Sequence, residues 1–237
     1  MQVAILAGGL ATRLRPVTET IPKAMIPIEG KPFLEYQIDF LKKNGVTDIV
    51  LCVGYLSESI EQYFGDGQKF GVTIQYVHDG ERLLGTAGAL KRAEAHLQEH
   101  FFVMYGDSYL FLDFQEAYAH FTKSNKLALM VVYKNNNLYD QSNVAIENGM
   151  VSWYDKKNSN GDLRYIDYGA LIFKRSVLDL IPDGQIYPLE TVIQDLIQRK
   201  EVSAFEVSQR FYEIGSHKGM DEFKQYIQNL VGEEVKL

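Results

Sequence analysis

Cysteine is almost missing from this sequence, since Cys52 is the one cysteine among 237 residues. A single cysteine excludes an intrachain disulfide framework and is typical of a reducing compartment. No apolar run approaches the roughly 18 residues of a membrane-spanning helix. Met1 leads directly into an apolar stretch, without the charged-then-apolar layout of a signal peptide. We therefore expect a cytoplasmic protein with no membrane partner.

Positive charge is also in short supply. Lysine and arginine total 24 against 31 aspartate and glutamate residues, so the net charge is −7 at pH 7. Broad contact with nucleic acid requires an excess of basic residues, which this chain lacks. We expect no nucleic-acid partner. Any phosphate that such an acidic protein handles must be held by locally clustered cations and by a metal such as Mg²⁺.

Several patterns of catalytic chemistry are absent too. The five histidines show no metal-binding spacing such as His-Glu-x-x-His, and no serine lies in a nucleophile-elbow pattern. There is no internal repeat and no low-complexity linker. With 46% hydrophobic and 23% charged residues, the composition is that of an ordinary globular domain.

The first half of the chain alternates strand and helix patterns. Buried strands are predicted at residues 2–7, 48–53, 72–77 and 101–105. Helices are predicted at residues 32–44, from an N-cap at Ser57 to residue 63, at 90–97 and at 114–121. This alternation predicts right-handed βαβ units. We therefore expect an α/β fold with a doubly wound, mostly parallel, Rossmann-like sheet.

The second half has a different pattern. Short strand-like runs and polar turns are followed by two further helical patterns, with strands predicted at residues 128–133, 143–146, 150–154, 165–173 and 202–207 and helices at 188–199 and 221–230. We interpret this part as a smaller mixed β region folded over the sheet edge. In doubly wound sheets, ligands bind beyond the carboxyl ends of the strands. The Gly8-Gly9 loop, the Gly85 segment and Asp107 are therefore expected to share one cleft.

Glycines and cations coincide after the first strand. The loop reads Gly8-Gly9-Leu10-Ala11-Thr12-Arg13-Leu14-Arg15-Pro16-Val17-Thr18, and Pro22-Lys23 follows. Glycine N–H groups allow close approach to phosphate, and Arg13 and Lys23 supply fixed positive charge. The loop lacks the third glycine of a dinucleotide site and the Gly-Lys-Ser/Thr ending of a Walker A loop. An ordinary β–α turn is the alternative, but we favour a nucleoside triphosphate site.

This motif resembles the signature of the sugar-phosphate nucleotidylyltransferases, or sugar nucleotide pyrophosphorylases. Their signature reads Gly-Gly-x-Gly-Thr-Arg-Leu-x-Pro-x-Thr, followed by Pro-Lys. The one departure here is Ala11, where glycine is usual and a Cβ would narrow the triphosphate turn. The resemblance extends over almost the whole chain. It implies a Mg²⁺-dependent enzyme that converts an NTP and a sugar 1-phosphate into an NDP-sugar and pyrophosphate.

The resemblance also implies roles for parts of the chain. Residues 1–237 would form a single domain, with the nucleotide on residues 1–125 and the sugar phosphate and the last metal ligand on residues 126–237. Arg13 would neutralise the departing pyrophosphate, and Lys23 would contact phosphate near the reacting centre. The nucleotide would be held by Leu6, Ala7, Gly8, Gly9, Thr12, Arg13, Glu81, Gly85 and Thr86. Asp79 and Glu81 are both candidates to accept hydrogen bonds from the base.

Two carboxylates are candidates to bind Mg²⁺. Asp107 follows an apolar strand in the run Gly106-Asp107-Ser108, which resembles the family's metal motif. An aspartate in a turn is the simpler alternative. The second ligand in the family is an aspartate before Ile-Gly or Val-Gly, and here Glu213 stands in that place. Its longer arm still reaches, but the metal position would shift.

The sugar phosphate is expected on two later segments. Asp155 and Lys156 resemble the family's Glu-Lys pair, and because Lys157 follows, the register is open by one residue. A solvated charged turn is an equal alternative. Asp167 and Gly169 stand where relatives often have Asn-x-Gly. A carboxylate only accepts hydrogen bonds, whereas an amide also donates, so this exchange indicates a different sugar.

Several functions are compatible with these motifs. Within the family, the chain most resembles compact guanylyltransferases that act on heptose or mannose 1-phosphate. Uridylyl or thymidylyl transfer to another sugar 1-phosphate is an alternative. Ala11 and Glu213 also leave open a catalytically idle nucleotide-sugar-binding regulatory subunit. A glycosyltransferase would share the GT-A-like topology but would not release pyrophosphate, and the basic first loop argues against it. A homodimer is one option for the assembly.

Overall fold

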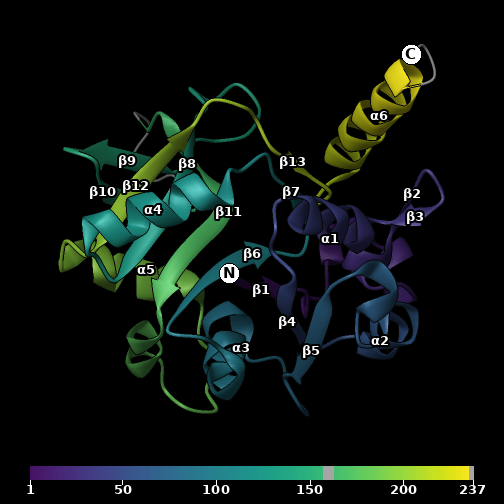
Figure 1. Cartoon of the computed structure of the whole chain (residues 1–237), viewed down its shortest axis with the longest axis horizontal. Coiled ribbons are helices and arrows are strands. Elements are labelled where there is room, and N and C mark those ends of the chain that lie inside the picture. The colour runs from purple at the N-terminus through teal and green to yellow at the C-terminus, as the bar shows by residue number, and fades with distance from the viewer. Residues whose placement is uncertain (157–162, 235–237) are drawn as a thin grey trace.

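A central sheet with helices on both faces forms the body of the molecule (Figure 1). The structure is a computed structural model that describes residues 1–156 and 163–234. Within them, nine strands form one sheet in the order β5-β4-β1-β6-β11-β8-β12-β10-β9. The bounds are β1 Gln2–Leu6, β4 Asp48–Val53, β5 Thr73–His78, β6 His100–Tyr105, β8 Ala128–Lys134, β9 Val144–Glu147, β10 Met150–Tyr154, β11 Tyr165–Lys174 and β12 Val202–Val207.

Helices cover both faces of this sheet. Their bounds are α1 Phe33–Lys43, α2 Ser57–Phe64, α3 Gly85–Arg92, α4 Phe114–Ser124, α5 Leu189–Gln198 and α6 His217–Glu234. Alternate strand residues face opposite layers: Val3 and Ile5 pack in the layer of α1, α2 and α4, whereas Ala4 packs in the layer of α3 and α5. This explains why the strands are apolar at successive positions. None of the described helices is both long and apolar enough to cross a bilayer.

The sheet is mixed, which corrects the prediction of a mostly parallel one. Strands β5, β4, β1 and β6 pair in parallel, as the alternation predicted. Strand β11, however, lies between β6 and β8 and is antiparallel to both. The later strands β9 and β10 then extend this same sheet, so they do not fold over its edge. Strand order depends on pairing between distant segments, which local periodicity does not report.

Two local predictions were also wrong. The helix expected at residues 90–97 is α3, Gly85–Arg92, so the glycine-rich segment forms its first turns. A 3-10 turn, Glu94–His96, replaces the rest of the expected helix. Ser57 does not cap α2. The capping position is Leu56 in a left-handed conformation, and the Ser57 side chain is buried, 3.4 Å from Nδ1 of His78.

A third apolar cluster attaches α6 to the start of the chain. Phe223 and Ile227 pack there with Leu14 of the glycine-rich loop and with Ile214. The helix then extends away from the body (Figure 1). Strand β2 (Pro27–Ile28) pairs with β3 (Lys31–Pro32) beside this cluster, and β7 (Ser108–Tyr109) pairs with β13 (Tyr212–Glu213). The cluster therefore brings the late segment around β13 next to the first loop.

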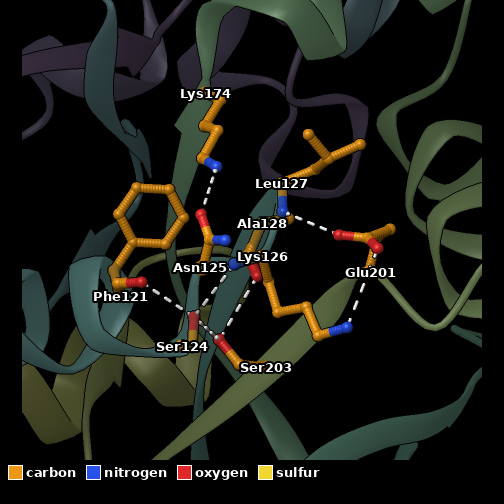
Figure 2. A network of polar contacts seen from close by, with 9 residues as sticks. All are labelled: Phe121, Ser124, Asn125, Lys126, Leu127, Ala128, Lys174, Glu201 and Ser203. Carbon is orange, nitrogen blue, oxygen red and sulfur yellow. Dashed lines mark hydrogen bonds and ion pairs between the residues drawn. The ribbon is translucent and has the colours of Figure 1, made fainter.

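Figure 2 shows a polar network where the chain enters β8 and β12. The Glu201 carboxylate accepts a hydrogen bond from the Leu127 N–H at 3.1 Å and lies 3.7 Å from Nζ of Lys126. The Ser203 hydroxyl is buried and donates to the Ala128 carbonyl at 3.3 Å. Strands β8 and β12 both begin at this edge of the sheet, opposite the carboxyl ends of β1 and β6.

Candidate active site

A first cavity lies at the carboxyl ends of the parallel strands. Its volume is about 260 Å³, and its lining residues are Leu6, Ala7, Gly8, Gly9, Ala11, Lys23, Ala24, Cys52, Asp79, Leu83, Gly85, Thr86, Ala89, Tyr105, Gly106 and Asp107. The first loop, the Gly85 segment and Asp107 therefore meet in one space. This confirms the shared cleft that the topology predicted.

The two glycines of the first loop have different surroundings. A Cβ on Gly8 would lie 3.1 Å from the backbone nitrogen of Gly54, so this glycine allows β1 and β4 to approach. A Cβ on Gly9 would meet no atom within 4 Å. Gly9 therefore leaves open space at the cavity wall, where a ligand can approach the backbone.

Ala11 forms the sharp turn of this loop. Its backbone is left-handed, with φ 47° and ψ 45°, and the Thr18 hydroxyl donates to its carbonyl at 2.9 Å. An L-residue with a Cβ is strained in this conformation, which explains why glycine suits the position. Ala11 also lines the first cavity, so this residue lies at the expected triphosphate site.

A second cavity adjoins the first and is more polar. Its volume is about 410 Å³, and its lining residues are Arg13, Tyr105, Asp107, Ser108, Asp140, Gln141, Asn143, Lys156, Ile166, Asp167, Gly169, Phe211 and Glu213. Tyr105 and Asp107 belong to both linings. Two ligands in these cavities would therefore meet beside the Asp107 carboxylate.

Asp107 and Glu213 reach the second cavity from neighbouring backbone. Strand β13 pairs with β7 so that Glu213 lies opposite Ser108, and the Ile214 N–H donates to the Asp107 carbonyl at 2.9 Å. Burial raises the pKa of the Glu213 carboxyl, and the negative charge of Asp107 raises this pKa further. Two carboxylates in this arrangement gain from a cation between them.

Lysine and arginine offset part of this negative charge. Lys23 forms an ion pair with Asp107. A Cβ built on Gly215 would lie 3.2 Å from Nη2 of Arg13 and 3.2 Å from Oε1 of Glu213. The same position is 3.3 Å from Nζ of Lys23. Two cations and the late carboxylate thus converge around a residue with no side chain.

The carboxylate pair of Asp107 and Glu213 matches a common type of Mg²⁺ site, which substrate phosphates and water complete. Across residues 1–156 and 163–234, no group of three or more histidine, cysteine, aspartate or glutamate side chains is arranged to hold a metal. Mg²⁺ is commonly bound by one or two carboxylates together with substrate phosphates and water. Asp107 and Glu213 are the residues that could supply the protein's part of such a site, and the cavity that both line leaves room for phosphate.

The lining of the second cavity includes a buried carboxylate, that of Asp167. Asp167 accepts hydrogen bonds from the Tyr154 hydroxyl at 2.9 Å and the Gly169 N–H at 3.0 Å. Burial raises its pKa, while the charge of Lys156 opposes this rise. Nζ of Lys156 lies 3.5 Å from the Tyr105 hydroxyl and 5.0 Å from the centre of that ring.

Gly169 explains how Asp167 reaches the site. Its φ of +88° coincides with a register shift in β11 between Asp167 and Leu171. A Cβ at Gly169 would lie 3.2 Å from Oγ of Ser108. Because β11 runs against β6, its first residues lie at the edge where β6 ends. The backbone at Gly169 thus packs closely against the turn that carries Asp107.

Most of the predicted site residues line one of these two cavities, but three do not. Glu81 is exposed and outside both linings. Asp79 instead is buried, lines the first cavity and accepts from the Leu84 N–H at 3.1 Å. Thr12 faces solvent at the start of a 3-10 turn. Asp155 belongs to neither lining, and Lys157 lies outside the described residues.

Arg13 lies differently from expectation. It lines the second cavity and a neighbouring polar cavity, but not the first cavity. Its place beside Glu213 follows from the third apolar cluster, which buries the adjacent Leu14 against the segment around Ile214. Any contact from Arg13 to a triphosphate therefore comes from the side of the carboxylate pair.

Sequence reasoning missed several lining residues. Tyr105 separates the two cavities, and its position directly before Gly106-Asp107 was a signal that could have found it. Asn143 accepts from the Asp167 N–H at 2.9 Å through Oδ1. Asp140 is a second negative charge, after Asp107, that raises the pKa of Glu213. No local motif marks Asn143 or Asp140, because their proximity to the site depends on the pairing of β8, β9 and β11.

Two cavities adjoin at the edge of this α/β sheet, one beside a glycine-rich loop, and they share a carboxylate. This arrangement is typical of α/β proteins that bind phosphates. The chain belongs to the nucleotidyl transferase family, whose model matches residues 2–229. The resemblance of its motifs to the sugar-phosphate nucleotidylyltransferases is thereby confirmed.

Curated relatives differ in the nucleotide that they use. The chain is 30% identical to the D-glycero-alpha-D-manno-heptose 1-phosphate guanylyltransferase of Campylobacter jejuni, over 91% of this chain and 95% of that protein. It is 35% identical to the UTP--glucose-1-phosphate uridylyltransferase of Synechocystis, over 80% of this chain. The match covers 53% of that second protein, so the chain spans about half of its length.

Solved structures share the architecture. A protein from Bacillus anthracis solved with sucrose has a TM-score of 0.84 at 21% identity, covering 95% of this chain and 94% of that one, which shows the common fold alone. HddC from Yersinia pseudotuberculosis, complexed with GMP-PN, has a TM-score of 0.78 at 26% identity. This match covers 95% of the present chain and 99% of HddC.

Proposed function

We propose that this protein is a Mg²⁺-dependent nucleotidylyltransferase that makes an NDP-sugar and pyrophosphate from an NTP and a sugar 1-phosphate. The observation that carries the proposal is the meeting of two cavities at Asp107. The first cavity, beside the glycine-rich loop, takes the NTP. The second cavity, beside Lys156 and Asp167, takes the sugar 1-phosphate.

The reaction is a direct displacement at phosphorus. An oxygen of the sugar phosphate attacks the α-phosphorus of the NTP, and the bond to the oxygen that bridges the α- and β-phosphates breaks. The nucleophile is already ionised, so no general base is required. The protein's work is therefore to position the two phosphates and to neutralise charge.

Individual side chains have separate tasks in this proposal. Asp107 and Glu213 would hold Mg²⁺, which neutralises phosphate charge when bound. Lys23, beside Asp107, holds phosphate near the reacting centre. Arg13 lies next to Glu213 and stabilises the leaving pyrophosphate. Lys156 lines the second cavity beside Tyr105 and holds the phosphate of the sugar.

Guanine is the base that we propose. Asp79 is buried in the wall of the first cavity, and one of its oxygens accepts from Leu84. The carboxylate has further lone pairs and can only accept. Guanine offers neighbouring N–H donors on its pairing edge, whereas the single uracil donor is flanked by carbonyl oxygens. The heptose guanylyltransferase of C. jejuni, which matches over 95% of its length, supports GTP with heptose or mannose 1-phosphate.

UTP with glucose 1-phosphate is the second candidate. The 35% identity to the Synechocystis uridylyltransferase favours it, over about half of that protein's length. Base and sugar are set by different cavities, so each must be tested independently.

Three further properties remain part of the proposal. We infer a Rossmann-like, GT-A-like arrangement in which residues 1–125 bind the nucleotide and residues 126–237 bind the sugar phosphate. A cytoplasmic location is consistent with the buried thiol of Cys52, whose pKa burial raises to about 12. A homodimer stays a prediction that light scattering would test.

A matrix of NTPs against sugar 1-phosphates, read by pyrophosphate release with Mg²⁺, tests the function. We expect turnover with GTP and heptose or mannose 1-phosphate, and its loss in Asp107→Ala with folding intact. Lys23→Ala should lose at least about a hundredfold in kcat, the scale of a lost transition-state contact. A folded protein that releases no pyrophosphate with any pair would be a binding or regulatory subunit instead.

A further inference from the structure

Gln37 is a polar side chain in an apolar position. Helix α1 buries one stripe at helical spacing, whose members are Phe33, Leu34, Gln37, Ile38 and Leu41. Gln37 has 1% of its surface exposed. Packing alone favours an apolar residue here, because burying an amide costs free energy unless it forms hydrogen bonds. The amide of Gln37 must therefore be explained by what it contacts.

The Gln37 amide spans the turn that carries Asp107. Its Nε2 donates to the Tyr105 carbonyl at 2.9 Å and to the Ser108 carbonyl at 2.7 Å. These carbonyls lie immediately before and after Gly106-Asp107. Because both partners are acceptors, the amide nitrogen must face them. Its Oε1 is buried and has no hydrogen-bond partner among the described residues. Both hydrogen bonds of the Gln37 side chain therefore go to the turn that carries Asp107.

Main-chain contacts fix the other sides of the same turn. The Gly106 N–H donates to the Leu6 carbonyl at 3.0 Å, and the Ile214 N–H donates to the Asp107 carbonyl at 2.9 Å. Strand β1 and the segment after Glu213 therefore each hold the turn at one point. Gln37 holds it at two points, on both sides of Asp107.

We propose that Gln37 is a positioning residue for the metal-binding carboxylate. This inference rests on the proposed function, in which Asp107 binds Mg²⁺. By fixing the carbonyls of Tyr105 and Ser108, Gln37 sets the direction of the backbone at Asp107. It thereby sets where the Asp107 carboxylate lies relative to Glu213. A misplacement of about 1 Å in such a group can cost about a hundredfold in rate.

Gln37→Met tests this proposal, because methionine is similar in length and volume but cannot donate. Mn²⁺, a paramagnetic oxygen-binding ion, serves as the probe and is titrated by electron paramagnetic resonance in the presence of GTP. We expect Mn²⁺ affinity to fall at least about tenfold and kcat to fall at least about tenfold, with KM for the NTP changed by less than about threefold. Hydrogen exchange of the amides of residues 106–109 should accelerate at least about tenfold.

Leu41→Ala is the matched control. Leu41 lies on the same buried stripe, and its truncation destabilises α1 by opening a cavity. It makes no hydrogen bond to the Asp107 turn, so Mn²⁺ affinity and exchange at residues 106–109 should follow the wild type. Gln37→Asn provides a second test that keeps the donor but is too short to reach both carbonyls. It should weaken Mn²⁺ binding in the same direction.

The outcomes separate this proposal from the proposed function. Wild-type Mn²⁺ affinity in Gln37→Met would overturn the role of Gln37, and if that variant does not fold, the same result in Gln37→Asn would do so. If Leu41→Ala weakens Mn²⁺ binding as much, Gln37 acts through stability alone. If the wild type binds no Mn²⁺ with any NTP, or Asp107→Ala binds it normally, the proposed metal site itself fails.

Discussion

At the scale of single residues, this site depends on where side chains are missing as much as on where charges stand. Gly8 allows two strands to approach, Gly9 leaves the cavity wall open, and Gly215 lies among the charged groups of Arg13 and Glu213. An added methyl group at each position would meet a different neighbour. The three glycines are therefore not equivalent, and their substitution separates folding from ligand binding.

The pair Gly8→Ala and Gly9→Ala should show this separation. At Gly8 the new Cβ would press on the Gly54 backbone, so we expect unfolding free energy to fall by about 1–3 kcal/mol. At Gly9 nothing lies within 4 Å, so stability should stay level or rise by up to about 1 kcal/mol. Because the proposed function places the triphosphate against Gly9, the KM of the Gly9→Ala variant for the NTP should rise at least about tenfold. Urea unfolding and steady-state kinetics measure these effects, and an unchanged KM would argue against triphosphate at Gly9.

Asp167 should make stability depend on pH in a defined direction. Burial raises the pKa of its carboxyl above the ordinary 3.8, against the charge of Lys156. Above this ordinary value the unfolded chain has released the proton that the folded chain still holds. Folding therefore takes up a proton, and this group's contribution to unfolding free energy falls as pH rises through the raised pKa.

Asp167→Asn removes that titration while keeping the shape of the side chain. Relative to the wild type, we expect this variant to gain stability as pH rises from about 4 to about 8. Urea unfolding of both proteins across this range provides the comparison. The raised pKa would be contradicted if the difference in unfolding free energy between the two proteins stayed constant with pH. It would also be contradicted if that difference changed in favour of the wild type as pH rises.

At the scale of elements, the site depends on strand ends that are brought together by pairing. The short strands β7 and β13 place Glu213 beside Asp107 although they are about a hundred residues apart. Strand β11 runs against β6 and so brings Asp167 to the same edge. The network around Glu201 holds the opposite edge, where β8 and β12 begin.

Glu201→Ala should weaken this opposite edge without touching the cavities. The Leu127 N–H would lose its 3.1 Å acceptor and Lys126 its ion-pair partner, so unfolding free energy should fall by about 1 kcal/mol. Glu201→Gln keeps an acceptor and should lose less. Pyrophosphate release should stay within about twofold of the wild type for both variants, because neither contacts the site. A large loss of activity at full stability would show that the two edges are coupled.

At the scale of the whole molecule, one sheet joins residues 1–125, the proposed nucleotide part, to the strands of the proposed sugar part. Strand β11 pairs with β6 over five residue positions and also pairs with β8. Residues 1–125 by themselves would expose the edge of β6, which the native chain buries. The apolar layers on both faces of the sheet contain residues of the two parts, so the parts share one core.

This continuity predicts one cooperative unfolding transition. Trp153, the one tryptophan of the sequence, lies on β10 near the far end of the sheet. Its fluorescence reports on the later part of the sheet around β10, whereas far-UV circular dichroism reports on the whole chain. We expect both signals to give the same urea midpoint. Separate midpoints would mean that residues 1–125 and 126–237 unfold as two domains.

Some of this architecture could be predicted because its signals are local. Apolar runs identified β1, β4, β5 and β6, and the glycine-rich loop with Asp107 indicated a shared cleft. Asp79 and Glu81 could not be separated, since both follow the same strand and only the turn after β5 decides which one points inwards. Gln37 gave no signal, because its partners lie about seventy residues further along the chain.

The sequence by itself determined most of the helices and strands and the glycine-rich loop of the kind that binds phosphate. It also determined the enzyme family that this loop resembles and the acidic character of the chain. These are properties of neighbouring residues, which periodicity and motif spacing report directly. The tertiary structure alone decided that β11 is reversed within the sheet, that Arg13 lies beside Glu213, and that Gln37 holds the Asp107 turn. Each of these depends on contacts between distant segments, which form only when apolar faces on different elements are buried together.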